Sequence, residues 1–230
     1  MVKIKEVTAG IVLDSRKEKT IAVAVKTDKG TFSASAPTGK STGKYEAKSY
    51  KTTIDGDIKQ IKEMSDYFSN EELKSFDDLK KIEEIVKKYV GANTLFAFES
   101  AILKAIAKEQ KKDVWQLINP KASKFPRLVG NCIGGGKHSE GYGKFNKKPD
   151  FQEFLLIPET NSVIMAFDGM KNAKVDAEVI LENIDENFEN EKNDENAWQT
   201  SFDDRQVLEV MKELKDNTWD ERKLYLDVGV

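Results

Sequence analysis

Polar and apolar residues alternate with a period of two along two short stretches near the N-terminus. Residues 20–25 and 31–36 both alternate in this way, and Asp28-Lys29-Gly30 between them has the composition of a tight turn. This pattern predicts a β-hairpin. A further strand is predicted near residues 4–13, so we expect the chain to begin with a three-stranded meander.

Downstream of the meander, the apolar spacing becomes that of helices. Two groups of apolar residues each fall on one helical face: Ile58, Ile61 and Met64, and then Leu79, Ile82, Val86 and Tyr89. Ser75, with Asp78 three residues later, is predicted to cap the second helix. We expect Asn93 to cap a third helix through residues 95–106, and Asp113 to cap a short fourth helix that ends before Pro120.

The order of these elements predicts two structural regions. Strands followed by a run of helices indicate an α+β domain, and the polar, proline-bearing segment 119–124 is typical of a boundary, so the first domain is predicted at 1–124. After it, apolar patterns predict strands near 128–133 and 151–157, helices near 162–188 and 203–214, and a last strand at 223–228. The order of this second region is ββααβ. Residues 185–196, rich in Asn, Asp and Glu, are predicted to form a solvated loop.

Composition narrows the classes of function. The 230-residue chain has 37 basic and 40 acidic side chains, and the resulting net charge of -3 argues against nucleic-acid binding. The first six residues do not form an apolar leader and no later stretch has the length of a membrane span, which predicts a cytoplasmic protein with no membrane partner. Cys132 is the only cysteine, so it cannot form an internal disulfide, and we interpret it as a small buried side chain.

The loop at residues 37–47 is the first candidate for ligand binding. It has two glycines and three Ser or Thr hydroxyl groups after a predicted strand, which suits a mobile loop that closes over an anionic ligand. Gly39-Lys40-Ser41 also matches the end of a phosphate-binding P-loop. That motif requires a glycine where Ala34 stands and a helix directly afterwards, so we do not expect nucleotide binding.

A second candidate loop contains Gly134-Gly135-Gly136-Lys137-His138. Consecutive glycines allow the backbone to approach a ligand closely, and the only histidine of the chain stands at the end of the run. The alternative is a flexible connection with an incidental surface histidine. The loop alone does not decide between the two.

Three acidic residues are the third candidate: Glu153, Glu195 and Asp227. A carboxylate inside an apolar strand, as at Glu153 and Asp227, is costly to bury without a cation, a metal or a hydrogen-bonding partner. In parallel barrels such residues are usually catalytic, because active sites gather where the strands end. The alternative for each is an edge strand that turns its carboxylate to water.

Five short motifs occur in the order and rough spacing of the enolase family. They are Leu13-Asp14-Ser15-Arg16, Thr38-Gly39-Lys40-Ser41-Thr42-Gly43 with Glu46-Ala47, Gly91-Ala92-Asn93, Gly135-Gly136-Lys137-His138 and Gln152-Glu153-Phe154. The chain therefore resembles an enolase over nearly its whole length. The resemblance implies an α+β N-terminal domain at 1–124, a three-stranded meander followed by helices, joined to a partial α/β barrel of ββααβ order at 125–230.

Enolases dehydrate 2-phosphoglycerate to phosphoenolpyruvate in glycolysis, and two magnesium ions stabilise the dianion formed when the proton beside the carboxylate is removed. By resemblance, Ser41 on the closing loop and Asp227 are magnesium ligands. His138 is a substrate-binding residue near the phosphate and the leaving hydroxyl. Glu153 and Glu195 form the acidic pair that assists departure of that hydroxyl, with Glu195 as general acid, and Glu153 and Ser41 also bind substrate.

The chain also departs from the family pattern. Asn196-Ala197 follows Glu195 where the family has glycines, and Tyr45 replaces a histidine. Only 106 residues (230 minus 124) follow the predicted boundary, whereas a whole barrel takes about 250. The matched part lacks the lysine base of the family, two further magnesium carboxylates and the phosphate-binding arginine and serine.

Two hypotheses follow from the resemblance. The first is a partial or split enolase that is inactive alone and acts with a second polypeptide, either a C-terminal enolase half or a second copy in a homodimer. The second is a non-catalytic enolase-like module that binds a phosphorylated metabolite or a protein. Both predict association, because a sheet of about three barrel strands leaves backbone groups and apolar surface uncovered.

Overall fold

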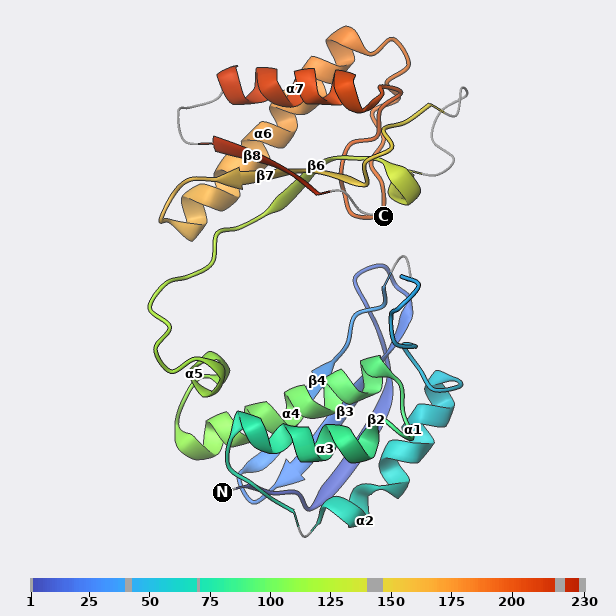
Figure 1. Cartoon of the computed structure of the whole chain (residues 1–230), viewed down its shortest axis with the longest axis vertical. Helices are drawn as coiled ribbons and strands as arrows, with labels where there is room; N and C mark the ends of the chain where they lie inside the picture. Colours follow the sequence, from blue (N-terminus) through green and yellow to red (C-terminus); the bar gives the residue numbers. More distant parts are fainter. Residues whose placement is uncertain (1, 40–42, 70, 140–146, 218–221, 228–230) are drawn as a thin grey trace. The chain divides into compact units, whose positions relative to one another are not determined.

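The structure is a computed structural model that describes residues 2–39, 43–69, 71–139, 147–217 and 222–227, with the backbone alone at 217 and 222–227. The chain divides into two units, Met1–Ser123 and Lys124–Val230 (Figure 1). Each unit has its own hydrophobic core.

The first unit begins with the antiparallel sheet that the alternation predicts. Strands β2 (Glu6–Leu13), β3 (Lys19–Thr27) and β4 (Gly30–Ser35) pair in chain order, and two turn residues join β3 to β4. Alternate residues of β3, namely Ile21, Val23 and Val25, are buried. A further pair of short strands, β1 (Val2–Lys3) and β5 (Glu72–Leu73), has no counterpart in the sequence prediction.

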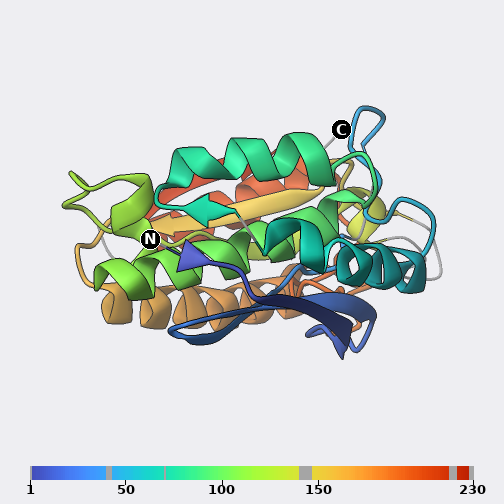
Figure 2. The same ribbon diagram turned by 90° about the horizontal axis from the view of Figure 1, so that it is seen from below.

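Helices cover this sheet. They are α1 (Ile54–Glu63), α2 (Ser65–Phe68), the 3-10 turn η1 (Phe76–Asp78), α3 (Leu79–Val86), α4 (Ala92–Gln110) and α5 (Val114–Ile118). Helix α4 packs against β3 and β4, and α3 packs against α4, so α4 lies between the sheet and α3 (Figure 2). A helix in that position must be apolar on more than one face, and α4 accordingly buries adjacent residues such as Ala97 and Phe98.

Two of the predicted helix caps are present. The Asp78 carboxylate accepts a hydrogen bond from Ser75 N at 2.9 Å, and this capping box starts η1, which leads into α3. Asp113 and Gln116 form a second capping box at the start of α5. Tyr89, predicted on the face of the second helix, lies beyond the end of α3 and is exposed.

The predicted cap at Asn93 is wrong. Helix α4 begins at Ala92, and its N-cap is Gly91. Ala92 N and Asn93 N donate to the carbonyl oxygens of residues 48 and 49 at 2.9 and 3.0 Å, so the preceding loop satisfies the first amides of the helix without a capping side chain. The loop comes so close that a Cβ at Gly91 would lie 2.3 Å from Cα of Tyr50.

The second unit is a three-stranded sheet with two long helices. Strands β6 (Gly130–Gly134), β7 (Glu153–Pro158) and β8 (Arg222–Asp227) pair in the order β6-β7-β8, and the 3-10 turn η2 (Gly136–Ser139) follows β6. Helices α6 (Val163–Ile184) and α7 (Asp204–Asn217) pack on the sheet and on each other (Figure 1). The ββααβ order is therefore confirmed. Among the described residues, no helix combines the length and apolar content that crossing a membrane requires.

The direction of β7 differs from that of the strands in a wholly parallel barrel. β7 runs antiparallel to both of its neighbours, so β6 and β8 point the same way on either side of it. The start of β7 and the ends of β6 and β8 consequently lie at one edge of the sheet. Along β7, Phe154 and Leu156 are buried against the helices, whereas Glu153, Leu155 and Ile157 lie on the other face and are partly exposed.

The predicted solvated loop is wrong at its first residue, Asp185, which is only 4% exposed. Its carboxylate accepts hydrogen bonds from Thr200 Oγ1 at 2.6 Å and from Ser201 N and Oγ at 2.9 and 2.6 Å. Burial disfavours the charged form, but the hydrogen bonds from Ser201 and Thr200 outweigh it and hold the pKa of Asp185 below its ordinary value. The carboxylate thereby ties the start of the loop to the segment that follows it.

Candidate functional site

His138 is held beyond the end of β6 by a turn that requires glycine. Gly135 N donates to Gln152 O at 3.0 Å, and a Cβ at Gly135 would lie 2.3 Å from Phe151 O and 2.6 Å from Pro149 O. A side chain therefore fits there only if the backbone moves. The turn leads into η2 and leaves His138 only 7% exposed, so the alternative of an incidental surface histidine is wrong.

Glu195 is presented by a hydrogen-bonded turn. Asn193 Oδ1 accepts from Glu195 N at 3.0 Å and from Ala197 N at 2.9 Å. Asn196 has a φ of 63°, the left-handed conformation that glycine favours and that asparagine tolerates better than most residues. The departure at Asn196-Ala197 is thus compatible with a glycine-like backbone beside Glu195.

The segment after this turn lies along β6. Trp198 N donates to Cys132 O at 3.0 Å, and Gly134 N donates to Trp198 O at 2.9 Å. Cys132 is buried, as the sequence predicts. Because β6 also leads into the turn that carries His138, one strand positions both His138 and Glu195.

These two segments bring His138 and Glu195 into contact. Glu195 Oε2 lies 2.7 Å from His138 Nδ1, and Asn131 Nδ2 donates to the same oxygen at 3.3 Å. On the other side of the ring, His138 Nε2 lies 2.9 Å from the side-chain nitrogen of Gln152. Glu153 completes the group, because one potential ligand atom each from His138, Glu153 and Glu195 lies within 4.8 Å of the other two. We call these three residues the His138 cluster.

Glu153 and Asp227 meet at the same edge of the sheet. Glu153 is the first residue of β7, Asp227 is the last residue of β8, and they are Cα partners in the antiparallel pairing. The reversed direction of β7 therefore brings these two residues together, because the start of β7 lies beside the end of β8. Since β7 is the central strand of the described sheet, the edge-strand alternative is wrong for Glu153.

Ser41 lies outside the described residues. Of the same loop, Gly43 N donates to Glu46 Oε2 at 2.9 Å, and Tyr45 is 92% exposed. The structure thus groups His138, Glu153 and Glu195 through their side chains and adds Asp227 through the strand register, whereas the role of Ser41 stays a prediction.

Sequence reasoning missed three polar residues around the cluster: Asn131, Gln152 and Asn193. Asn131 interrupts an apolar strand, which is a signal of the same kind that identified Glu153. Gln152 belongs to the Gln152-Glu153-Phe154 motif but received no role of its own. Nothing in the composition of the loop distinguishes Asn193 from its neighbours, because its role depends on the turn that it closes.

The donor chemistry separates a magnesium site from the His138 cluster. Magnesium prefers oxygen ligands and keeps several waters. Asp227, the Cα partner of Glu153, is of the residue type that magnesium prefers, because its side chain offers only oxygen ligands. The nitrogen of His138 suits other metals better than magnesium.

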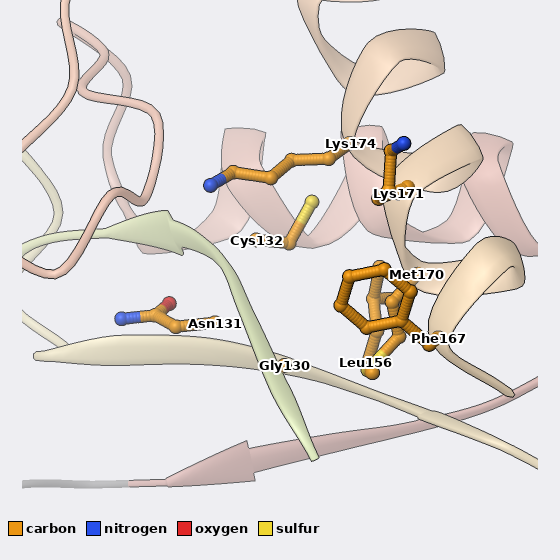
Figure 3. Close-up of a pocket in the computed structure, with 8 residues that line it drawn as sticks. All are labelled: Gly130, Asn131, Cys132, Leu156, Phe167, Met170, Lys171 and Lys174. Atoms are coloured by element: carbon orange, nitrogen blue, oxygen red, sulfur yellow. The ribbon is translucent and has the colours of Figure 1, made fainter. Parts of the chain in front are cut away.

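A cavity of about 160 Å³ lies beside β6 on the side of α6. Its lining is Gly130, Asn131, Cys132, Leu156, Phe167, Met170, Lys171 and Lys174. Figure 3 shows Leu156, Phe167 and Met170 together at one end of it. Burial, and then the charge of Lys192, lower the pKa of Lys174 from its ordinary value. Asn131 connects this cavity to the His138 cluster through its hydrogen bond to Glu195.

Comparisons with known proteins agree with one another. Residues 4–118 match the family model described as "Enolase, N-terminal domain". The chain is 29% identical over 244 residues to an enolase of Methanosphaera stadtmanae, covering 98% of this chain and 56% of the relative. It is 30% identical over 235 residues to an enolase of Methanothermobacter thermautotrophicus (95% and 53%) and 30% identical over 248 residues to one of Natronomonas pharaonis (100% and 59%). The chain spans a little over half the length of these curated relatives.

Proposed function

The chain belongs to the enolase family, and on that premise we propose that it is part of an enzyme that dehydrates 2-phosphoglycerate to phosphoenolpyruvate in glycolysis, in the cytoplasm. The observation that carries the proposal is the contact of Glu195 Oε2 with His138 Nδ1, 2.7 Å apart, with Glu153 beside them. Departure of a hydroxyl group requires a proton, and a partly exposed carboxyl beside a buried imidazole can supply one.

In the proposed reaction, a base takes the proton from the carbon beside the substrate carboxylate. The electron pair of that C–H bond forms the double bond as the C–O bond of the neighbouring carbon breaks, and the hydroxyl leaves as water with a proton from Glu195. Glu153 binds the departing hydroxyl together with Glu195. His138 lies next to both carboxyls and binds substrate, and Asn131 orients Glu195 through its hydrogen bond at 3.3 Å.

Asp227 and Ser41 would hold magnesium in this proposal. When bound, magnesium supplies positive charge that stabilises the negative charge formed on the substrate carboxylate. The position of Asp227 opposite Glu153 supports a metal beside the acidic pair.

We further propose that 1–124 is the enolase-like N-terminal domain, that 125–230 is the beginning of the barrel domain, and that a partner completes the site. β6 and β8 are the outer strands of the described sheet, and Leu155 and Ile157 of β7 are only partly covered. Such a surface favours association with a C-terminal enolase half or with a second copy of the chain. The chain spans a little over half the length of the relatives, and we assign the base to the part of an enolase that it does not span.

The test is reconstitution. The chain is mixed with a C-terminal half taken from one of the relatives above, and formation of phosphoenolpyruvate is followed by its ultraviolet absorbance with and without magnesium. We expect activity only when both halves and magnesium are present, and loss of activity with Glu195→Gln. If the two halves bind each other in a sedimentation experiment and still produce no phosphoenolpyruvate, the proposal is wrong.

One observation favours the alternative, a non-catalytic binding module. Tyr45 is 92% exposed and stands beside Lys44, whose Nζ lies 5.5 Å from the centre of its ring, and exposed aromatic and cationic groups are common at protein interfaces. Calorimetry with phosphoenolpyruvate separates the two functions. An enolase part in its reconstituted complex binds it in a magnesium-dependent manner, whereas a protein-binding module does not.

A further inference from the structure

The His138 cluster has the geometry of a site for a transition-metal ion. Its three donors come from separate segments: His138 from η2, Glu153 from the start of β7 and Glu195 from the turn before Trp198. Zinc binds imidazole nitrogen at about 2.0–2.1 Å and carboxylate oxygen at about 2.0–2.2 Å, so two ligands of a tetrahedral ion lie roughly 3.3–3.5 Å apart. The cluster brackets this separation, with one pair of donor atoms 2.7 Å apart and all three within 4.8 Å.

The contact between His138 Nδ1 and Glu195 Oε2 gives a second, independent indication of a metal site, because of its direction. His138 Nδ1 is buried and has no hydrogen-bond partner, although Glu195 Oε2 lies only 2.7 Å away. The oxygen is therefore close to the nitrogen but off the line along which a ring N–H donates. A cation bound in the ring plane at Nδ1 would satisfy this nitrogen and remain within reach of the carboxylate, which the present contact does not achieve.

The opposite side of the imidazole supports the same assignment. Ligating histidines generally donate their second N–H to a neighbouring group, which fixes the tautomer that leaves the first nitrogen free to bind metal. Gln152 stands at that position, 2.9 Å from His138 Nε2. Its amide can present oxygen in place of nitrogen by a half-turn of the side chain, and Nε2–H then donates to Gln152 while Nδ1 keeps its lone pair.

The charge of the three donors and the exposure of the His138 cluster also suit a divalent ion. Two carboxylates and one neutral imidazole neutralise a divalent ion, and water completes a four-ligand sphere. The side chain of His138 is 3% exposed and that of Glu195 is 30% exposed, so an ion enters past Glu195. Magnesium competes poorly for a set that includes nitrogen.

We propose that His138, Glu153 and Glu195 bind one divalent transition-metal ion, with Zn²⁺ as the probe, separately from the magnesium assigned to Asp227 and Ser41. Binding itself needs no substrate and does not depend on the proposed activity. Its regulatory consequence does rest on that proposed function: with the ion bound, Glu195 is a ligand and cannot deliver a proton, so zinc inhibits the dehydration.

The test measures zinc binding to the full 230-residue chain by equilibrium dialysis in excess magnesium. We expect one equivalent of zinc. His138→Asn and Glu195→Gln should each weaken binding more than tenfold, and Gln152→Leu should weaken it roughly tenfold as a residue that orients the histidine. Glu186→Gln, at an exposed residue of the same loop, and Cys132→Ser, at the only thiol, should leave binding unchanged.

A measurement on the unaltered chain keeps the test independent of how well the variants fold. His138 is the only histidine, so one pair of imidazole ¹⁵N resonances reports it. A zinc-dependent shift of Nδ1 supports the proposal. Absence of stoichiometric zinc binding, an unshifted Nδ1, or loss of binding with Cys132→Ser would each overturn it. A chain that binds zinc but fails in the reconstitution assay refutes the proposed function and leaves this site intact.

Discussion

Glu153 and Asp227 stand opposite each other at one end of the antiparallel pair β7 and β8. Directly paired residues of antiparallel strands have Cα atoms about 4.5–5.5 Å apart. One carboxylate of the proposed acidic pair and one proposed magnesium ligand are therefore fixed by the same strand register, and the His138 cluster shares Glu153.

Replacement of Glu195 by Gln should abolish most activity of the reconstituted enzyme. The amide keeps the shape of the side chain but cannot supply a proton, so we expect kcat to fall by roughly 10²- to 10⁴-fold with a much smaller change in KM. Steady-state assays of phosphoenolpyruvate formation measure both constants, with Glu186→Gln as the matched control. An unchanged kcat would remove Glu195 from the acid role.

Gly135→Ala should destabilise the turn that carries His138. Its new Cβ would lie 2.3 and 2.6 Å from two backbone oxygens, and relief of such contacts costs about 2–3 kcal/mol of the free energy of unfolding. Gly169→Ala is the matched control, because nothing lies within 4 Å of its added Cβ. In the interior of α6 it should stabilise by about 0.5–1 kcal/mol. Thermal unfolding of the two variants should shift in opposite directions.

Asp185→Asn should loosen the loop at residues 185–196, which carries Glu195. The amide cannot accept all the hydrogen bonds that Thr200 and Ser201 donate to the carboxylate, and we expect a loss of about 2–3 kcal/mol. The folded-state pKa of Asp185 is lowered, so its contribution is present above the ordinary pKa of 3.8 and is lost as the pH falls through the folded-state value. Urea unfolding at neutral pH, with the exposed Asp168→Asn as control, measures the loss. Equal effects of the two variants would contradict it.

Glu99 should make the first unit less stable as the pH rises. Burial, and then the charge of Glu83, raise the pKa of Glu99 from 4.5 to about 7. Between these two values the folded chain holds a proton that the unfolded chain has released, so the free energy of unfolding decreases as the pH rises through that window. The penalty is complete above the folded-state pKa.

Glu99→Gln removes this penalty. At about pH 8 the variant should be more stable by about 1 kcal/mol, a value reduced for solvent screening of a half-buried group, and at about pH 4 the two proteins should agree. Urea unfolding midpoints at both pH values make the comparison. An equal difference between the proteins at the two pH values would show that the effect is not one of protonation.

Variants at Asn196 test whether asparagine replaces glycine at this position without loss of stability. In a left-handed conformation, Asn196→Ala should cost about 1 kcal/mol, because the Cβ clash is no longer offset by local hydrogen bonding, and Asn196→Gly should be neutral or stabilising. Chemical denaturation of the unaltered chain and the two variants ranks their free energies of unfolding. If Asn196→Ala is as stable as Asn196→Gly, backbone strain at this turn plays no part in presenting Glu195.

Local patterns in the sequence predicted local structure well. The β3–β4 hairpin and the capping boxes at Ser75 and Asp113 depend on residues two to four positions apart, and all three are present. The cap at Asn93 failed because the amides of α4 bond to a loop more than forty residues earlier, at Lys48 and Ser49. Side-chain type alone does not encode such a contact.

The candidate site was predictable in its residues but not in its geometry. A carboxylate in an apolar strand identified Glu153, but alternation has the same period in parallel and antiparallel strands, so the direction of β7 was not accessible. Asp185 was assigned to solvent because its neighbours are polar, and only Thr200 and Ser201 explain its burial. Each miss involves partners that the chain brings together from a distance.

The reversed central strand makes the chemistry sensitive to pairing errors. If β7 slipped by one residue against β8, Leu155 and Ile157 would exchange faces with Phe154 and Leu156, and Glu153 would point toward the helices. Such a slip would bury a charge and expose the largest side chains of the strand at the same time. The buried residues Phe154 and Leu156 therefore also fix the register that keeps Glu153 at the end of the sheet.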